Sequence, residues 1–251
     1  MTEIGLPGDV RVCLFDLDGV LTPTALIHAA AWKEMFDEFL RRRDGGRGEE
    51  RFRPFDAGED YDHYVDGRPR AEGVRSFLDS RGIELPEGEE DDPPDAETVH
   101  GLGNRKNVLV LEKIRTQGVK PYPGSVRYVE AVRAAGLRTA VVSSSANTKD
   151  VLVSAGIEHL MDVRVDGLTA IEQGLRGKPK PDTFLAAARE LGAEPGQAAV
   201  FEDALVGMDA GREGQFGYVV GVDRVGQAEE LRKHGADIVV TDLSDLLGRT
   251  V

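Results

Sequence analysis

The sequence has a single cysteine and no long hydrophobic run. Cys13 cannot form an internal disulfide bond, which predicts a reducing, cytoplasmic location. No apolar run approaches the roughly 20 residues that cross a bilayer. The first eleven residues lack the basic stretch followed by an apolar one that marks a secretory signal. We therefore expect a cytoplasmic protein that does not associate with membranes.

Positive charge is also in short supply. The 31 Lys and Arg residues stand against 45 Asp and Glu residues, so the formal net charge is −14. Such a surface repels nucleic acid and anionic lipid, because binding to phosphate scales with accumulated Lys and Arg. We expect no nucleic-acid partner and a monomer. A small phosphorylated substrate remains possible where a few cations gather locally.

The chain contains enough apolar residues to form a buried core. Of its 251 residues, 40% are hydrophobic, which makes wholesale disorder implausible. This length allows either one large domain or a core domain with a smaller one.

From residue 121 onward, strands alternate with helices through short glycine turns, which is typical of βαβ units and a parallel sheet. Strands are predicted over 138–142, 161–165, 198–201, 218–222 and 238–240. Helices are predicted over 125–135, 149–155, 181–191, 204–213 and 228–234. The apolar run 10–15 is a further buried strand that resembles this half of the chain.

After the first strand, a segment with a different residue pattern interrupts this alternation of strands and helices. Residues 24–43 have helical spacing, with Thr22 or Thr24 as a cap, and 44–48 break the helix. A short helix is predicted over 73–80 and another over 107–115, with an acidic, proline-rich solvated loop over 86–97. We predict a Rossmann-like α/β core with helices on both faces, made of 1–23 and 120–251, and an inserted, mostly helical cap domain of 24–119.

Polar residues that follow strands are the ones to inspect, because ligands bind at the carboxyl ends of parallel strands. Four such clusters stand out, at Asp16/Asp18, Ser143, Lys178 and Glu202/Asp203. Paired carboxylates can divide a nucleophile role from an acid–base role. A second acidic pair completes an oxygen-rich site for Mg²⁺. A hydroxyl and a lysine then hold phosphoryl oxygens during transfer.

These clusters resemble the four ordered motifs of the haloacid dehalogenase superfamily. They are DLDGVLT at 16–22, VVS at 141–143, KPKPD at 178–182 and VFED at 200–203. The resemblance covers about 155 residues of the core, and the insertion point is that of the superfamily's helical-cap subfamily. DxDG alone is a weak signal, whereas four motifs in order are a strong one.

The resemblance implies a role for each core residue. Asp16 is the nucleophile that forms an aspartyl-phosphate, and Asp18 protonates the leaving oxygen and later deprotonates the attacking hydroxyl. Ser143 and Lys178 bind the phosphoryl group. Mg²⁺ is the implied cofactor, and its implied ligands are Asp16, the backbone oxygen of Asp18 and Asp203, with Glu202 ligating or orienting.

Within the subfamily, the inserted segment resembles that of the β-phosphoglucomutases. The implied substrate-binding residues are His28 on the first cap helix, Gly67, Arg68 and Arg70 in a cap loop, Lys106 in a basic segment, and Ser145, Ala146 and Asn147 in a core loop. Arg70 would grip the distal phosphate, since a guanidinium fork suits phosphate. The sequence departs from the family at Pro23, at Ala204 and in the long acidic insertion.

These features leave three functional hypotheses. The first is a phosphomutase that interconverts β-D-glucose 1-phosphate and D-glucose 6-phosphate through a bisphosphate. The second is a phosphatase of a small phosphorylated metabolite, such as a sugar phosphate or a phosphoglycolate-like compound. The third is a catalytically silent binding protein. Taken singly, the carboxylates also fit a solvated turn or helix caps, and the cap residues fit ordinary surface side chains.

Overall fold

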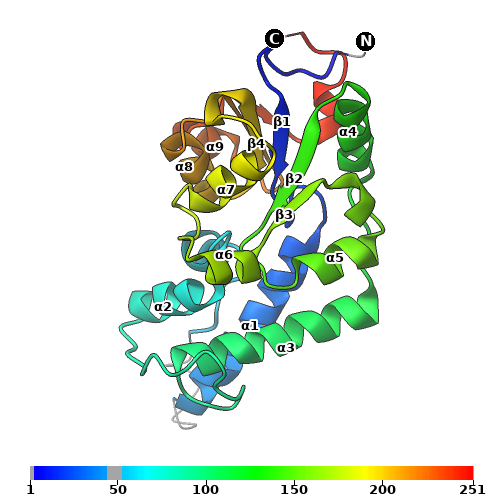
Figure 1. Cartoon of the computed structure of the whole chain (residues 1–251). Helices are drawn as coiled ribbons and strands as arrows, with labels where there is room; N and C mark the ends of the chain where they lie inside the picture. The colour runs from blue at the N-terminus through cyan, green and yellow to red at the C-terminus, as the bar shows by residue number, and fades with distance from the viewer. Residues whose placement is uncertain (1–2, 44–52, 251) are drawn as a thin grey trace. The chain divides into compact units, whose positions relative to one another are not determined.

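The structure is a computed structural model that describes residues 3–43 and 53–250 (Figure 1). The chain forms two compact units. One consists of Met1–Thr24 and Val119–Val251, and is called the α/β unit below. The other is Ala25–Gly118, the helical unit. In the described part of the chain, no helix combines the length and the apolar character needed to span a membrane.

The α/β unit is built on a parallel sheet of six strands among the described residues, in the order β3-β2-β1-β4-β5-β6. The strands are β1 (Val12–Phe15), β2 (Arg138–Val142), β3 (Val163–Val165), β4 (Ala198–Glu202), β5 (Tyr218–Val222) and β6 (Ile238–Val240). Val12 of the central strand lies opposite Arg138 on one side and Ala198 on the other. The carboxyl ends of β1, β2 and β4 therefore meet at one edge.

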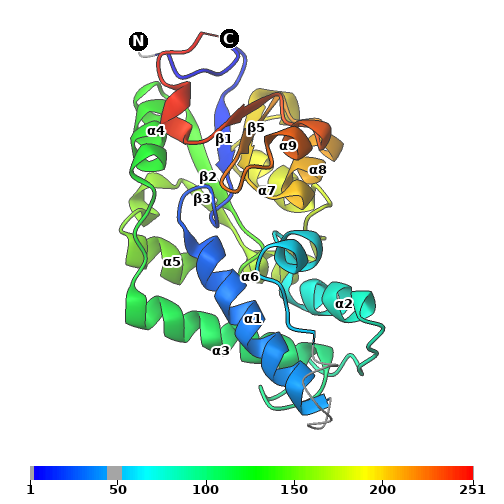
Figure 2. The ribbon, with the colours of Figure 1, turned by 180° about the vertical axis from the view of Figure 1, so that it is seen from behind.

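Helices cover both faces of this sheet, as the two views in Figures 1 and 2 show. On one face, Leu14 packs into a cluster with Phe184 and the helices α7 (Asp182–Glu190), α8 (Leu205–Glu213) and α9 (Ala228–Lys233). On the other, Phe15 stacks on Phe201 at 4.4 Å and meets Tyr128 of α4 (Pro123–Ala134) edge-on. Because neighbouring strand residues point to opposite faces, the short β1 serves both cores. The predicted fold class is confirmed.

Several predicted bounds in this unit were wrong. The first strand spans Val12–Phe15, not 10–15, and β3 begins at Val163, not 161. Just before β3, Asp162 Oδ2 accepts the Thr139 backbone N–H at 2.8 Å, and the Asp162 backbone N–H donates to Thr139 O at 2.8 Å. Sequence analysis also missed α6 (Gly167–Gln173) and three one-turn helices, Glu158–Leu160, Pro195–Gln197 and Leu243–Leu246. The remaining helix of this unit is α5 (Thr148–Ala155).

The helical unit packs around aromatic rings. It contains α1 (Thr24–Arg43, whose first residue belongs to the α/β unit), a π-helical turn (Tyr61–Val65), α2 (Arg70–Ser80) and α3 (Val99–Gln117). Phe36 is fully buried and stacks on Trp32 at 5.2 Å, with Phe55 and Phe77 against it at 5.4 and 4.1 Å. Such aromatic burial stabilises a unit that has no sheet among its described residues.

Helix α1 spans the predicted residues, but α2 and α3 are longer than predicted. Helix α2 begins at Arg70, so this arginine lies on a helix rather than in a loop. Helix α3 begins at Val99, not 107, and Thr98 caps it by accepting the Gly101 backbone N–H at 2.9 Å. Gly101 and Gly103 conceal the start of this helix, because glycine is a poor helix former. The predicted break at 44–48 lies outside the described residues.

Candidate active site

Asp16 lies at the carboxyl end of the central strand. Its backbone N–H donates to Phe201 O at 2.9 Å, so β4 holds the position at which β1 ends. The Lys178 ammonium lies 2.5 Å from Asp16 Oδ1, and it also donates to Glu202 Oε1 and, at 3.4 Å, to Val142 O. Lys178 is 1% exposed. The ends of β1, β2 and β4 are thus joined through one buried lysine.

Burial and neighbouring charges shift the pKa values of Asp16 and Lys178. Burial raises the pKa of Asp16 well above its ordinary value, with Glu202 and Asp18 acting in the same direction against Lys178. Burial lowers the pKa of Lys178, but the carboxylates of Asp16 and Glu202 outweigh this and hold that pKa above its ordinary value. One ammonium therefore faces two buried carboxylates, an arrangement that favours a further cation.

Glu202 is oriented by bonds to both of its carboxylate oxygens. Oε1 accepts from Lys178, and Oε2 accepts the backbone N–H groups of Asp203 and Ala204, both at 2.9 Å. A Cβ on Gly207 would lie 1.9 Å from Glu202 Oε1, so glycine is needed there for α8 to approach this carboxylate. These bonds suit Glu202 to orienting its neighbours more than to direct ligation.

Asp16, Glu202 and Asp203 form the candidate metal site. Each offers a carboxylate oxygen within 4.8 Å of the others, and all three residues are buried. Gly19 makes room for this arrangement: its φ is +87°, and a Cβ there would lie 1.7 Å from Asp203 Oδ2. A donor set made only of oxygens fits a hard divalent cation. The residues present therefore fit such an ion.

The Asp18 side chain turns toward hydroxyl groups. Thr24 donates to Asp18 Oδ1, and Ser143 Oγ lies 3.5 Å from Oδ2. The Thr24 hydroxyl, predicted as a helix cap, is instead used by Asp18, while Thr22 Oγ1 lies 2.6 Å from Thr24 Oγ1. Sequence analysis missed this contact, although a threonine at the start of the helix that follows the motif is a usable signal. These hydroxyl groups contact both carboxylate oxygens and thereby hold the Asp18 side chain in place.

The loop after β2 is held by its own serines. Ser143 Oγ accepts the Ser145 backbone N–H at 3.1 Å, and Ser145 Oγ accepts that of Asn147 at 3.1 Å. A Cβ on Gly167 would lie 3.0 Å from the Ala146 nitrogen, so the start of α6 presses on this loop. The structure thus brings Ser143 to Asp18 and keeps 145–147 immediately beyond it.

Arg224, which sequence analysis missed, braces the Asp16–Gly19 turn from the loop after β5. Its Nε donates to Gly19 O at 2.7 Å and its Nη1 to Thr241 O at 2.7 Å, while the guanidinium lies 3.8 Å from the centre of the Tyr122 ring. A lone arginine after a strand carries no motif, so only the fold reveals this contact.

Of the predicted residues in the helical unit, Lys106 and His28 contact each other, and Arg70 contacts Asn104. Lys106 Nζ lies 2.8 Å from His28 Nδ1 and 4.6 Å from the centre of the Trp32 ring. Arg70 Nη2 donates to Asn104 Oδ1 at 3.1 Å. Partial burial lowers the pKa of Arg70. Gly67, with a φ of +65°, and Arg68 lie in the turn that leads into α2.

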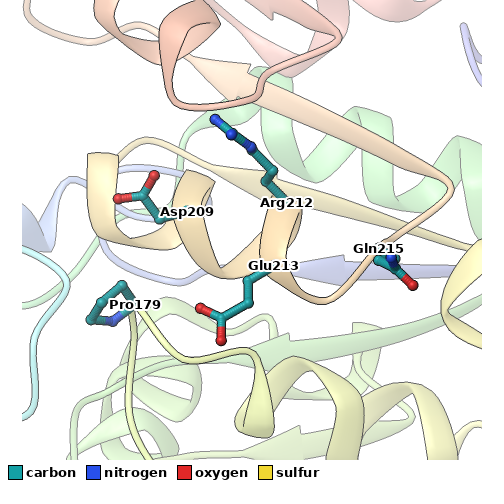
Figure 3. A pocket seen from close by; sticks show the side chains of 5 residues that line it. All are labelled: Pro179, Asp209, Arg212, Glu213 and Gln215. Carbon is teal, nitrogen blue, oxygen red and sulfur yellow. The ribbon is translucent and has the colours of Figure 1, made fainter.

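A hollow on the α/β unit lies along α8 (Figure 3). It is lined by Pro179, Asp209, Arg212, Glu213 and Gln215. Its acidic groups are engaged, since Glu213 accepts from Lys180 at 2.9 Å and Asp209 lies 2.9 Å from His234 Nδ1. None of its lining residues belongs to the Asp16 cluster, where the reactive groups converge.

Comparison with known proteins places the chain in a family. A model described as haloacid dehalogenase-like hydrolase matches residues 10–215. The chain belongs to the haloacid dehalogenase-like hydrolase family. The resemblance that the four motifs indicate is thereby confirmed.

Several β-phosphoglucomutases match this chain over almost their whole length. A β-phosphoglucomutase of Mycobacterium tuberculosis is 58% identical over 247 residues, covering 97% of this chain and 94% of the relative. One of Bacillus subtilis is 30% identical, covering 94% and 92%. The crystal structure of a β-phosphoglucomutase from Clostridium difficile superposes with a TM-score of 0.74 at 25% identity, covering 94% of this chain and 93% of that one.

Proposed function

We propose that the protein is a phosphomutase that interconverts β-D-glucose 1-phosphate and D-glucose 6-phosphate through an aspartyl-phosphate and a bisphosphate. The observation that carries this proposal is the 58% identity to β-phosphoglucomutases over nearly the full length of both chains. The buried carboxylate–lysine cluster supports it, because it contains the groups that phosphoryl transfer needs.

In the transfer step, an Asp16 oxygen bonds to phosphorus while the bond from phosphorus to the sugar oxygen breaks. Asp18 donates its proton to the departing oxygen, and in the return step it takes the proton from the attacking hydroxyl. Lys178 and Ser143 stabilise the phosphoryl oxygens as charge shifts onto them. The bond from Thr24 keeps the Asp18 carboxyl in place between these steps.

We infer that the cofactor is Mg²⁺, held by Asp16, the backbone oxygen of Asp18 and Asp203, with Glu202 as the orienting group. When bound, Mg²⁺ neutralises charge on the phosphoryl oxygens and offsets the repulsion between carboxylate and phosphate. Lys178 supplies the remaining positive charge, and Gly19 leaves the space that Asp203 needs.

We propose that the phosphate that is not being transferred binds to residues of the inserted cap. Arg70 holds it through its guanidinium, with Gly67 and Arg68 in the adjoining turn. Lys106 and His28 bind the substrate as a pair, and Ser145, Ala146 and Asn147 contact the sugar phosphate from the core loop. A mutase needs this second site because the bisphosphate must reverse its orientation while water is excluded.

The test supplies β-glucose 1-phosphate with a trace of the 1,6-bisphosphate and follows both products. We expect glucose 6-phosphate to form faster than free phosphate, and α-glucose 1-phosphate serves as the matched control substrate that does not react. If phosphate release is the faster reaction with every sugar phosphate tried, the protein is a phosphatase and the mutase proposal is wrong.

The remaining expectations concern the state of the protein in the cell. We propose a monomeric, cytoplasmic enzyme acting on a small phosphorylated sugar, without a nucleic-acid or membrane partner. The net charge of −14 supports the last point. Light scattering on the purified protein tests the monomer, and a dimer mass at micromolar concentration would contradict it.

A further inference from the structure

The acidic insertion (residues 86–97) is attached to the rest of the helical unit at particular points. Val99 N donates to Pro86 O at 3.0 Å, and Thr98 Oγ1, which caps α3, donates to Asp92 Oδ2 at 2.5 Å. Next to Pro86, Glu87 accepts from Arg75 of α2 at 2.7 Å. Although the insertion is largely exposed, these hydrogen bonds fix its position relative to α2 and α3.

Asn104 connects this insertion to Arg70. Its Nδ2 donates to the backbone oxygens of Glu90 at 3.0 Å and Asp92 at 2.8 Å, while its Oδ1 accepts from Arg70 Nη2 at 3.1 Å. An amide has two donor hydrogens on nitrogen and an acceptor on oxygen. Once both hydrogens are bound to the loop, the oxygen must face the arginine.

Two glycines of α3 allow these contacts. A Cβ on Gly101 would lie 2.4 Å from Ala96 O, so the end of the insertion lies directly on the helix. A Cβ on Gly103 would lie 3.3 Å from Arg70 Cγ and 3.5 Å from its Nε, so the arginine stem lies on the helix as well. Glycine disfavours a helix interior. Its presence at both positions is explained by the close packing of the insertion and of Arg70.

We propose that Asn104 is a positioning residue that holds the Arg70 guanidinium ready for the non-transferred phosphate, and that the acidic insertion holds Asn104. The proposal rests on the phosphate-binding role given to Arg70 under the proposed function. Orienting a flexible arginine before the ligand arrives reduces the entropy lost on binding. A neutral amide orients the guanidinium without neutralising it, whereas a carboxylate would compete with the phosphate.

The experiment compares Asn104→Ala with Gln117→Ala, which removes an exposed amide from the same helix. Each variant is assayed with glucose 1,6-bisphosphate and with acetyl phosphate, which has no second phosphate. For Asn104→Ala we expect KM for the bisphosphate to rise about tenfold with kcat nearly unchanged, because a ground-state orientation is lost. The kcat/KM for acetyl phosphate and the melting temperature should match those of Gln117→Ala.

Three further variants sharpen this test. In Arg70→Ala, the bisphosphate KM should rise by about a hundredfold, and adding Asn104→Ala to it should change nothing more, since coupled residues are not additive. Asn104→Asp, although isosteric, should raise KM at least as much as alanine does. Gly101→Ala, which displaces the insertion without removing a polar group, should raise it by a smaller factor.

The outcomes separate the two proposals. If Arg70→Ala raises the bisphosphate KM but Asn104→Ala behaves like Gln117→Ala, or if the two changes are additive, the positioning role is wrong and the phosphate site stands. If Arg70→Ala leaves the bisphosphate KM unchanged, the second phosphate site itself is wrong. Rescue by Asn104→Asp would overturn the argument from charge.

Discussion

The two units bury different kinds of side chain. At one edge of the sheet in the α/β unit, the titratable side chains of Asp16, Lys178 and Glu202 are buried, and Lys178 donates to both carboxyl groups. In the helical unit, the buried centre consists of stacked rings around Phe36. A charged side chain can be buried only where hydrogen bonds or an opposite charge compensate for the lost water. The sheet edge supplies such partners to Asp16, Lys178 and Glu202, whereas the helical unit compensates Asp60 with Arg81 in an ion pair.

The contrast extends to how polar residues are positioned. In the α/β unit, Asp16, Ser143 and Asp203 directly follow strands, so their places in the sequence predict that they lie at one edge of the sheet. In the helical unit, Arg70 and Lys106 lie on helices. Asn104 accepts a hydrogen bond from Arg70, and Lys106 contacts His28 and the Trp32 ring. Residues at strand ends are positioned by the backbone of the sheet. Residues on the helices of the helical unit are positioned by contacts with individual side chains.

The largest effect on activity is expected from Asp16→Asn, which removes the proposed nucleophile and leaves a side chain of the same shape. We expect turnover of β-glucose 1-phosphate to fall by about 10⁴-fold or more, because no phospho-enzyme can form. Acid quenching with labelled substrate should trap the phosphorylated wild type only. Asp162→Asn, the same change outside the site, should leave turnover within about twofold. A fall of less than tenfold in Asp16→Asn would contradict the assignment.

The counterpart in the helical unit is Phe36→Ala. Removal of a fully buried ring at the centre of the aromatic cluster should lower the free energy of unfolding by about 3–5 kcal/mol. Urea titration followed by tryptophan fluorescence measures it, since Trp32 stacks on this ring. Leu111→Ala, on an exposed position of α3, should cost less than about 0.5 kcal/mol. If both substitutions lowered the free energy of unfolding equally, the aromatic cluster would not be what stabilises the helical unit.

An intermediate effect is expected from Gly19→Ala, which tests the space beside Asp203. The new methyl group would displace the Asp203 carboxylate, so the Mg²⁺ concentration for half-maximal activity should rise about tenfold or more. Gly136→Ala is the matched control, because its φ of +88° carries the same backbone strain with no neighbour within 4 Å of the added carbon. A similar rise in both variants would point to strain instead of the clash.

The smallest effect concerns acid stability. The Thr139 backbone N–H and the Arg133 guanidinium outweigh partial burial and lower the pKa of Asp162. The folded protein therefore binds this proton more weakly than the unfolded chain, whose aspartate pKa is about 3.9. The carboxylate should contribute about 1 kcal/mol above that pH and lose this contribution as the pH falls further. Urea titrations of wild type and Asp162→Asn at pH 6 and pH 3 should differ at the higher pH and converge at the lower.

How far sequence predicts structure differs between the units for a physical reason. The strand–helix alternation, helix 24–43 and the polar residues after strands could be predicted, because each depends on local periodicity and on the rule that ligands meet strand ends. The early start of α3 could not, since Gly101 and Gly103 make sense only once the insertion and Arg70 are packed against them. Arg224 was missed because its partners, Gly19 O and Thr241 O, are backbone oxygens far away in sequence.

The sequence by itself was enough to predict the fold class and the family, and it supplied the residues that we propose for the chemistry. It could do so because strands, motifs and buried carboxylates leave local patterns that any similar chain must share. Only the tertiary structure decided that Thr24 serves Asp18, that Gly19 makes room for Asp203, and that Asn104 links the insertion to Arg70. Those contacts join residues by distance and direction in space, and hydrogen bonds and close packing depend on both.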